Sequence, residues 1–481
     1  MSADEPRTVF VSGIFNILHP GHVRLLRFAS ELGDRLVVGV LADTLAGDVV
    51  TVGDSSRLEA IQSLRMVDDT FLIEDSVTDT IRRLRPDIVV KGREHVTQEN
   101  EELAVLSTYG GRLMFSSGDS FFSSTDLIRS ELEIPRRLPI DLPVEFMAHH
   151  GITRDRLSEI LVSLSNVRVL VVGDSIVDEY VSCHPLGMSR EDPTLVVTPI
   201  ETESFVGGAA IVAAHAASVG GHASLHTVTG PDSQADFLSG ELSKYGVEAR
   251  LHADDSRPTT TKQRWRAGGK TLLRVSHLHQ DPISAALQRE FLDGVAATID
   301  EYDVLIFSDF NYGVLPQPLV DRLTDLGKQR GVTMAADSQA SSQIGDISRF
   351  VGMNLVTPTE YEARVATRNF EDGLVVLADR VRQKAQADLV LMTRAEDGVF
   401  VRGATDPTAE ATTERLPALN STPVDVAGAG DSLLVVASMA LSIGATMHEA
   451  ALLGSMAAAV QVSTTGNRPI RHDSLAEILA Q

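Results

Sequence analysis

The fold of the N-terminal part of this chain is decided by residues 8–22, TVFVSGIFNILHPGH. The first six residues form an apolar run typical of a β-strand, and Pro20 suits the first turn of a following helix. His19 and His22 stand three positions apart, so both imidazoles can project from the N-terminus of that helix. Imidazole N–H groups and the positive end of a helix stabilise the negative charge of a phosphate under attack. The stretch therefore predicts a strand–helix junction that binds phosphate.

Apolar runs and helix-like stretches alternate over the first 130 residues. We expect strands at Thr8–Ser12, Arg35–Ala42, Thr70–Ile73, Asp87–Val90 and Arg112–Ser116, with helices such as Val23–Leu32 and Ser56–Val67 between them. This alternation predicts a parallel sheet with right-handed crossovers, and ligands bind beyond the carboxyl ends of such strands. Residues 1–133 are therefore expected to form a Rossmann-like α/β domain, with His19 and His22 at its ligand-binding edge.

A proline-rich break separates this region from the rest of the chain. Pro135, Pro139 and Pro143 exclude a regular helix, so residues 134–150 are predicted to be a linker. His149 and His150 are then expected to be exposed linker side chains rather than metal ligands.

Residues 151–481 show a second α/β pattern, as the length of 481 residues would require of a chain with two or three domains. Thr153 is expected to cap a helix that runs to about Leu164. The expected strands are Val167–Val172, Val304–Phe307, Thr333–Ala336, Leu355–Thr357 and Leu389–Thr393. Segments 194–205 and 257–275 are rich in Val and Thr with polar alternation, which predicts the antiparallel strands of a small β lid.

The composition is that of an ordinary globular protein, with 43% hydrophobic and 22% charged residues. We expect neither a membrane span nor a signal peptide, and therefore a cytoplasmic location. The net charge of −24 argues against nucleic acid or anionic membranes as partners. The single cysteine, Cys183, excludes an internal disulfide and a cysteine-cluster metal site.

A second anion-binding motif lies at residues 425–431, DVAGAGD, before a helix-like run. Gly428, Ala429 and Gly430 allow a turn whose backbone N–H groups, with the helix dipole, form an anion hole for a transferring phosphoryl group. Asp431 can accept the proton of the attacking hydroxyl. The motif therefore predicts a phosphoryl-transfer site with Asp431 as its general base.

The N-terminal motif resembles the signature of the nucleotidyltransferase superfamily, G-x-F-D-x-x-H-x-G-H, with Asn16 in place of the usual aspartate. Residues 86–92, PDIVVKG, and 123–129, SSTDLIR, are similar to further motifs of that family. The resemblance implies catalysis by His19 and His22. It implies nucleotide binding by Gly13, Ile14, Phe15, Lys91, Ser123, Ser124 and Thr125.

The C-terminal motifs resemble those of the ribokinase (phosphofructokinase-B) family, in residues 173–178, GDSIVD, 207–210, GGAA, and 393–398, TRAEDG. The resemblance implies a ribokinase-like domain that uses ATP and Mg²⁺. It implies Asp431 as the base, with nucleotide contacts from Thr393, Gly398, Gly428, Ala429 and Gly430. It implies sugar contacts from Asp178, Gly207, Gly208, Lys262 and Arg264, and an indirect Mg²⁺ contact from Glu362.

Almost the whole chain resembles the bifunctional family of heptose 7-phosphate kinases and heptose 1-phosphate adenylyltransferases, with the two domains in reversed order. Further similar segments are 259–264, TTTKQR, 308–310, SDF, and 188–193, MSREDP. The resemblance implies ATP-dependent phosphorylation of a sugar phosphate, and AMP transfer to a sugar 1-phosphate that gives an ADP-sugar and pyrophosphate. The implied partners are a sugar phosphate, a nucleoside triphosphate and a second copy of the chain bound through the lid.

Four positions of the kinase half depart from the family pattern: Ile211 and Thr359 replace asparagine, Tyr312 replaces lysine and Ser276 replaces an acid. One interpretation is an active kinase with an altered sugar substrate. A second is an active nucleotidyltransferase beside a kinase-like half that only binds sugar or mediates dimerisation. A third is a cytidylyltransferase acting on an alditol phosphate, since the signature does not distinguish ATP from CTP.

Overall fold

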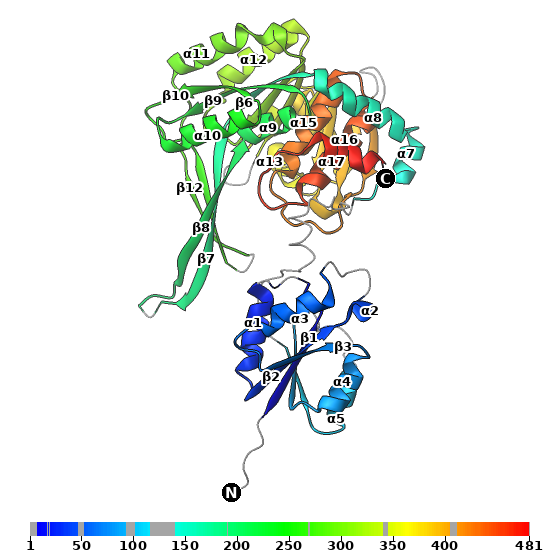
Figure 1. Ribbon diagram of the computed structural model, residues 1–481. Coiled ribbons are helices and arrows are strands. Elements are labelled where there is room, and N and C mark those ends of the chain that lie inside the picture. Colours follow the sequence, from blue (N-terminus) through cyan, green and yellow to red (C-terminus); the bar gives the residue numbers. More distant parts are fainter. Residues whose placement is uncertain are drawn as a thin grey trace. The chain divides into compact units, whose positions relative to one another are not determined.

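Two α/β units make up the chain, Met1–Arg137 and Leu138–Gln481 (Figure 1). The computed structural model describes residues 7–16, 18, 20–46, 52–92, 102–115, 140–189, 191–267, 270–339, 345–404 and 411–480. None of the helices in these ranges is long and apolar enough to cross a membrane.

The first unit contains a five-stranded parallel sheet in the order β3-β2-β1-β4-β5, as the alternating pattern predicts. Its strands are β1 Thr8–Gly13, β2 Arg35–Leu41, β3 Asp69–Ile73, β4 Ile88–Lys91 and β5 Arg112–Phe115. Its helices are α1 Pro20–Ser30, α2 Asp43–Ala46, α3 Asp54–Gln62, α4 Val77–Leu84 and α5 Glu102–Ser107. Alternate strand residues enter opposite cores: Val9 and Val11 pack with α1 and α3, whereas Phe10 packs with α4 and α5. Because both faces are covered, the central residues of the strands are mostly apolar.

The strand order indicates where a ligand would bind in this unit. The chain adds β2 and β3 on one side of β1 and then β4 and β5 on the other. The connections after β1 and β4 therefore leave in opposite directions, and a ligand crevice is expected at the carboxyl ends of these two strands. The junction quoted above, residues 13–22, starts at this point.

The second unit is built on a nine-stranded sheet in the order β10-β9-β6-β13-β14-β15-β16-β17-β18. The strands are β6 Arg168–Gly173, β9 His222–Thr229, β10 Glu248–Ala253, β13 Val304–Asp309, β14 Thr333–Ser338, β15 Leu355–Val356, β16 Leu389–Thr393, β17 Val399–Gly403 and β18 Thr412–Leu416. The first seven in the sheet order are parallel, and β17 and β18 form an antiparallel edge that the sequence pattern did not predict.

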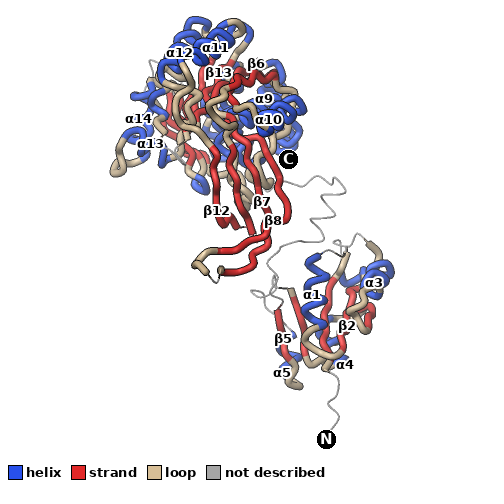
Figure 2. Tube along the Cα trace, turned by 90° about the vertical axis from the view of Figure 1, so that its left-hand side faces the viewer, coloured by secondary structure: helices blue, strands red, loops and turns tan. Residues whose placement is uncertain are grey.

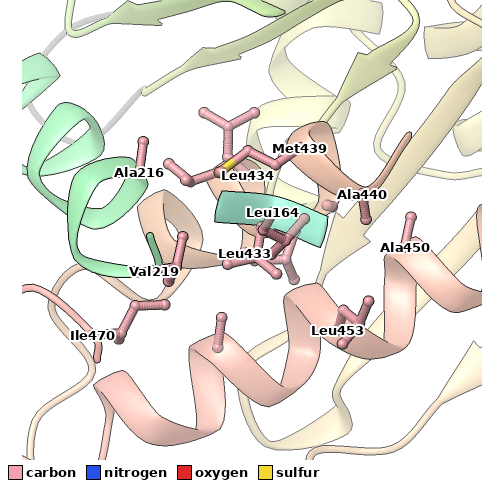
Figure 3. Packing of buried hydrophobic residues seen from close by; sticks show 14 of the residues in the cluster. Leu164, Ala216, Val219, Leu433, Leu434, Met439, Ala440, Ala450, Leu453 and Ile470 are labelled. Carbon is pink, nitrogen blue, oxygen red and sulfur yellow. The ribbon is translucent and has the colours of Figure 1, made fainter. Parts of the chain in front are cut away.

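Helices cover both faces of this sheet. One face carries α8 Arg154–Ser163, α9 Ala209–Ser218, α10 Ser233–Lys244, α15 Ala429–Ser442, α16 Met447–Gln461 and α17 His472–Ala480. The other carries α11 Ala285–Ala296, α12 Gln317–Arg330, α13 Glu360–Thr367 and α14 Leu374–Ala385. Figure 3 shows Leu433, Leu434 and Met439 of α15 among Leu164, Ala216 and Leu453 in the first of these cores. The apolar α15 is thus held rigidly, with its N-terminus at one fixed position.

The predicted lid is present as a four-stranded sheet in the order β12-β11-β7-β8, which projects beside the main sheet (Figure 2). Its strands are β7 Ser175–Met188, β8 Leu195–Gly208, β11 Thr261–Ala267 and β12 Lys270–His277. The pairs β7–β8 and β11–β12 are antiparallel, whereas β7 and β11 are parallel. The length of β7 was not predicted, because Pro185 and Gly187 interrupt its pattern at a register shift.

Residues 140–150 belong to the second unit rather than to a linker, which corrects the predicted linker 134–150; residues 134–139 lie outside the described ranges. Ile140 forms a β-bridge with Asn420, and Phe146 and Met147 of α7 Val144–His149 are buried in the core. The linker prediction was wrong at these residues because Pro143 is the N-cap of α7. At that position the missing N–H of proline removes no helical hydrogen bond. Thr153 caps α8 as predicted, accepting a hydrogen bond from the Arg156 N–H at 3.1 Å.

Separating the two units is expected to give two soluble fragments, 1–137 and 138–481, because each has its own core. A fragment that begins at residue 151 lacks Phe146 and Met147, and should be less stable than 138–481 by about 3–5 kcal/mol. Denaturant unfolding of the two longer fragments measures this difference. Equal stability of 138–481 and 151–481 would contradict the role of α7.

Candidate active sites

The turn after β1 brings His22 to the crevice of the first unit. Phe15 has a left-handed backbone conformation with φ +55°, and its buried ring meets the His22 imidazole edge-on with the ring centroids 5.0 Å apart. A Cβ atom on Gly13 would lie 3.1 Å from the same ring, so glycine provides the space for this turn. The ring of Phe15 thereby positions His22 in the first turns of α1.

A buried arginine that the sequence analysis missed fixes the same turn. Arg57 of α3 donates hydrogen bonds to the backbone carbonyl oxygens of Ile14 and Val52, and it pairs with the Asp43 carboxylate. Its side chain is fully buried. Its role could not be recognised from the sequence, because its three partners come from separate segments of the chain.

Lys91 ends β4 beside the last residues of β1, as the register Val11–Val90 requires. Its Nζ lies 2.8 Å from Glu102 Oε1 of α5, and both side chains are mostly buried. The predicted phosphate ligand is thus at the crevice but is held by an acid that the sequence analysis did not identify.

The structure therefore brings five of the predicted residues of this site to one edge, namely Gly13, Ile14, Phe15, His22 and Lys91. The other four, His19, Ser123, Ser124 and Thr125, lie outside the described residues.

The second site lies at the carboxyl edge of the nine-stranded sheet, where α15 begins. Gly428 has φ +76°, and a Cβ atom there would lie 2.3 Å from Asn467 Oδ1, so only glycine fits. Asp431, in the first turn of α15, is buried, and its Oδ1 has no hydrogen-bond partner among the described residues. Helix N-terminal N–H groups and a buried, unpaired carboxylate oxygen are what an attacking hydroxyl and a phosphoryl group require.

The pKa of Asp431 lies near neutral pH. Burial raises its pKa to about 7; the charges of Asp178 and Glu362 add to this rise, and Lys262 opposes it. A carboxylate with such a pKa can accept and release a proton at physiological pH.

Asp178 of β7 lies close enough to Asp431 for its charge to raise the pKa of Asp431. Its Oδ1 accepts a hydrogen bond from Arg264 at 3.4 Å, and its Oδ2 accepts one from Asn467 at 3.4 Å. A Cβ atom on Gly207 would lie 2.5 Å from Asp178 Oδ2, and one on Gly208, with φ +59°, would lie 2.2 Å from the Asp174 carbonyl oxygen. The glycine pair is therefore required by the close approach of β8 to β7. Burial raises the pKa of Asp178, and the Arg264 and Lys262 charges oppose that rise.

The positions that depart from the family pattern lie in different environments. Ile211 of α9 is fully buried in the core. Tyr312 is buried beside Phe310, and Lys262 Nζ lies 5.2 Å and 4.8 Å from the centroids of these two rings. Ser276 lies on the exposed strand β12. The cation–π contacts hold Lys262 close enough to Asp178 and Asp431 for its charge to oppose the rise in the pKa of both.

Thr359 and Glu362 form a capping box at the start of α13. Glu362 Oε2 accepts the Thr359 N–H and hydroxyl, both at 2.8 Å. Glu362 is buried, and its charge, after burial itself, helps to raise the pKa of Asp337 well above its usual range. The predicted Mg²⁺ contact is therefore a helix cap that also belongs to a group of mutually repelling buried acids.

Two aspartates whose roles the sequence did not reveal, the buried Asp174 and the partly buried Asp425, organise the loops of this site. Asp174 accepts hydrogen bonds from the backbone N–H groups of Phe310, Tyr312 and Val314, at 2.9–3.3 Å. Asp425 accepts hydrogen bonds from the Ala427 and Gly466 N–H groups, both at 3.1 Å, and from the Tyr180 hydroxyl at 3.2 Å. Both lie inside quoted motifs, but most of their partners come from distant parts of the sequence.

The predicted nucleotide loop follows β16 at the same edge. The Thr393 N–H donates to the Pro358 carbonyl oxygen at 2.9 Å. Gly398 has φ +80°, and a Cβ atom there would lie 2.2 Å from the Leu416 carbonyl oxygen. The loop is thus held between the segment before α13 and the end of β18.

Comparison with known proteins gives matches over both units. Residues 168–472 match the model of the pfkB family of carbohydrate kinases, and residues 10–130 match the cytidylyltransferase-like model. "Bifunctional protein HldE" of Shewanella piezotolerans is 31% identical over 326 residues, which cover 67% of this chain and 66% of that protein. The protein of the same name from Helicobacter hepaticus is 29% identical over 318 residues, which cover 65% and 64%. The chain thus spans just under two thirds of these relatives.

Solved structures agree on the fold of the second unit. Ribokinase from Thermotoga maritima has a TM-score of 0.52 at 19% identity, covering 66% of this chain and 100% of that one. Phosphofructokinase-2 from Escherichia coli, in complex with substrates and products, has a TM-score of 0.52 at 16% identity, covering 66% and 98%. At these identities the likeness concerns the fold alone.

Proposed function

The chain belongs to the pfkB family of carbohydrate kinases, and from this premise we propose that it is a bifunctional enzyme of sugar-nucleotide synthesis. Its second unit phosphorylates a sugar phosphate with ATP, and its first unit transfers AMP from ATP to a sugar 1-phosphate, giving an ADP-sugar and pyrophosphate. The observation that carries this proposal is Asp431, buried with an unpaired oxygen at the start of α15, on a chain that also places His22 at a nucleotidyltransferase-like crevice. The two relatives named as bifunctional proteins support it.

In the kinase unit, Asp431 takes the proton of the attacking sugar hydroxyl. Asp178 and Arg264, joined by their 3.4 Å contact, orient other hydroxyls of the sugar. The N-terminus of α15, with Gly428, Ala429 and Gly430, stabilises the charge on the transferring phosphoryl group, and Thr393 and Gly398 place the nucleotide.

Mg²⁺ fits the acids of this site. Asp337, Glu362 and Asp431 are buried together, and the charges of Glu362 and Asp431 both raise the pKa of Asp337. A divalent cation relieves such repulsion. Glu362 and Asp337 would hold the ion, which would neutralise charge on the phosphates.

In the nucleotidyltransferase unit, His22 and the start of α1 stabilise the charge that develops on the α-phosphate. Lys91 neutralises phosphate charge at the carboxyl end of β4, where Glu102 sets its position. We assign the same supporting roles to His19, Ser123, Ser124 and Thr125. A cytoplasmic location fits both reactions, because ATP is supplied there.

A substrate panel tests the proposal. The protein is incubated with ATP or CTP and with heptose 7-phosphate, other sugar phosphates or alditol phosphates, while ADP and pyrophosphate are followed separately. We expect ADP with a heptose 7-phosphate-like sugar, and pyrophosphate with ATP and a sugar 1-phosphate. If pyrophosphate is released but no sugar gives ADP, the second unit is a kinase-like half that does not turn over. Pyrophosphate only from CTP and an alditol phosphate would show a cytidylyltransferase instead.

The lid carries apolar side chains that suit pairing with a second copy of the chain. Leu186, Met188, Ile200 and Leu273 are all exposed on β7, β8 and β12. We expect a homodimer in solution, and Ile200→Asp with Leu273→Asp should convert it to a monomer in light-scattering measurements. Val162→Asp, at an equally exposed position of α8, should leave the dimer intact. A wild-type monomer at micromolar concentration would contradict this assembly.

A further inference from the structure

We propose that the second unit holds a divalent transition-metal ion, of the Zn²⁺ class, between His149, His150 and Glu414. His149 ends α7, His150 follows it, and Glu414 lies on β18. None of the three has a role in either of the proposed reactions. The sequence pattern predicts exposed linker histidines at these positions, but the structure places them against the second unit.

The three ligand atoms already converge. The Nε2 atoms of His149 and His150 each lie 3.8 Å from Glu414 Oε1, and all three ligand atoms lie within 4.8 Å of one another. A tetrahedral zinc ion with bonds of about 2.0–2.1 Å holds its ligand atoms roughly 3.4 Å apart. The side chains therefore need to approach by about 1 Å. His149, whose side chain is 70% exposed, is free to make this rotation.

His150 provides a ligand atom that lacks a partner in the described protein. The His150 side chain is only 12% exposed, and its buried Nε2 has no hydrogen-bond partner among the described residues. The 3.8 Å separation from Glu414 is too long for a hydrogen bond. Leaving a buried imidazole nitrogen unpaired destabilises the fold, and a metal bond would remove that cost.

Neighbouring rings hold His150 in place. His448, in the first turn of α16, stacks on it with the ring centroids 3.6 Å apart and the planes 15° from parallel. Phe146 meets it edge-on, with the centroids 4.7 Å apart. Stacked imidazole rings direct their nitrogen lone pairs side by side rather than toward one metal ion. His448 therefore lines the site without binding the ion. A water molecule would occupy the fourth coordination position of the ion. Such ring packing fixes the orientation of a ligand much as an outer hydrogen bond does.

The donor set identifies the class of ion. Two imidazole nitrogens and one carboxylate oxygen suit Zn²⁺ and its first-row neighbours, whereas Mg²⁺ and Ca²⁺ prefer oxygen ligands. The ion would link α7 to β18, and so secure the first helix of the second unit to the edge of its sheet. Its expected effect is stabilisation of this unit.

Metal binding by the full-length chain, without an affinity tag and after chelator treatment, tests the proposal. Zn²⁺ binding is measured by calorimetry, and Co²⁺ serves as a spectroscopic probe of tetrahedral coordination. Because the histidines of the first unit can also bind zinc, the readout is the difference between variants. Wild-type protein should bind one more equivalent of Zn²⁺ than His149→Gln or Glu414→Gln, or bind it at least about tenfold more tightly.

The control is His222→Gln, which removes an exposed histidine from β9 and should bind like the wild type. Zn²⁺ should raise the unfolding temperature of the second unit in the wild-type and His222→Gln proteins only. His149 is too exposed for its replacement to disturb folding, so its loss of binding would report on the metal itself. Equal Zn²⁺ stoichiometry and affinity in wild-type, His149→Gln and Glu414→Gln proteins would overturn the proposal.

Discussion

Asp431→Asn is expected to abolish sugar-dependent ADP formation, with a loss of about 10²–10⁴ in rate, because the amide cannot accept the hydroxyl proton. The substitution keeps the shape of a side chain whose Oδ1 is buried and unpaired, so ATP affinity should change little. A coupled ADP assay with the preferred sugar phosphate, together with calorimetry of ATP binding, measures both effects. A variant that retained more than a tenth of the wild-type rate would show that another group is the base.

The pH dependence of the wild-type enzyme provides an independent check. Burial raises the pKa of Asp431 to about 7, so the carboxylate becomes protonated, and unable to act as a base, as the pH falls below that value. The ADP-forming rate should therefore fall with acidification through neutrality. Asp281→Asn, at an exposed position, should retain both the rate and its pH profile.

His22→Ala is expected to reduce pyrophosphate release by about 10²–10³, the usual loss for one donor to a transition state. The imidazole lies in the first turns of α1 at the crevice, where the Phe15 ring positions it. His19→Ala should have a comparable effect. Pyrophosphate release from ATP and a sugar 1-phosphate is measured beside ADP formation.

The two active-site variants are controls for each other. His22→Ala should keep wild-type ADP formation, and Asp431→Asn should keep wild-type pyrophosphate release, because the residues belong to different units. His472→Ala, in α17, should affect neither. Near-normal pyrophosphate release by both His19→Ala and His22→Ala would refute the assignment of the first site.

The parallel sheets could be predicted from the sequence because their strands are buried on both faces. Runs such as that of β1, with Val9 and Phe10 in opposite cores, are continuously apolar and easily recognised. Elements outside this environment were harder to predict. The strand β7 carries a proline and a glycine at one of its register shifts, and α7 is a short helix that begins beside a proline.

The glycines and acids of the candidate sites could be anticipated where each of two partners stands in a recognisable motif. Gly207 and Asp178, which approach each other closely in the structure, are such a case. Arg57, Glu102 and Asp425 could not be anticipated, because their roles arise from contacts between segments that only folding brings together. Local sequence therefore identifies candidate functional groups more readily than it identifies the residues that fix those groups in position.

The connection between β6 and β7 has a mechanical consequence for the kinase unit. Only Asp174 separates Gly173, the last residue of β6 in the main sheet, from the first residue of β7 in the lid. Gly173 has φ +153°, and a Cβ atom there would lie 1.9 Å from the Ser308 carbonyl oxygen, so this joint is seated against β13. Because Asp174 also accepts three backbone hydrogen bonds from the segment after β13, the start of β7 is fixed to the main sheet, and Asp178 lies four residues further along this strand. A displacement of the lid relative to this fixed point would move Asp178 and Arg264 together, because their side chains are paired at 3.4 Å.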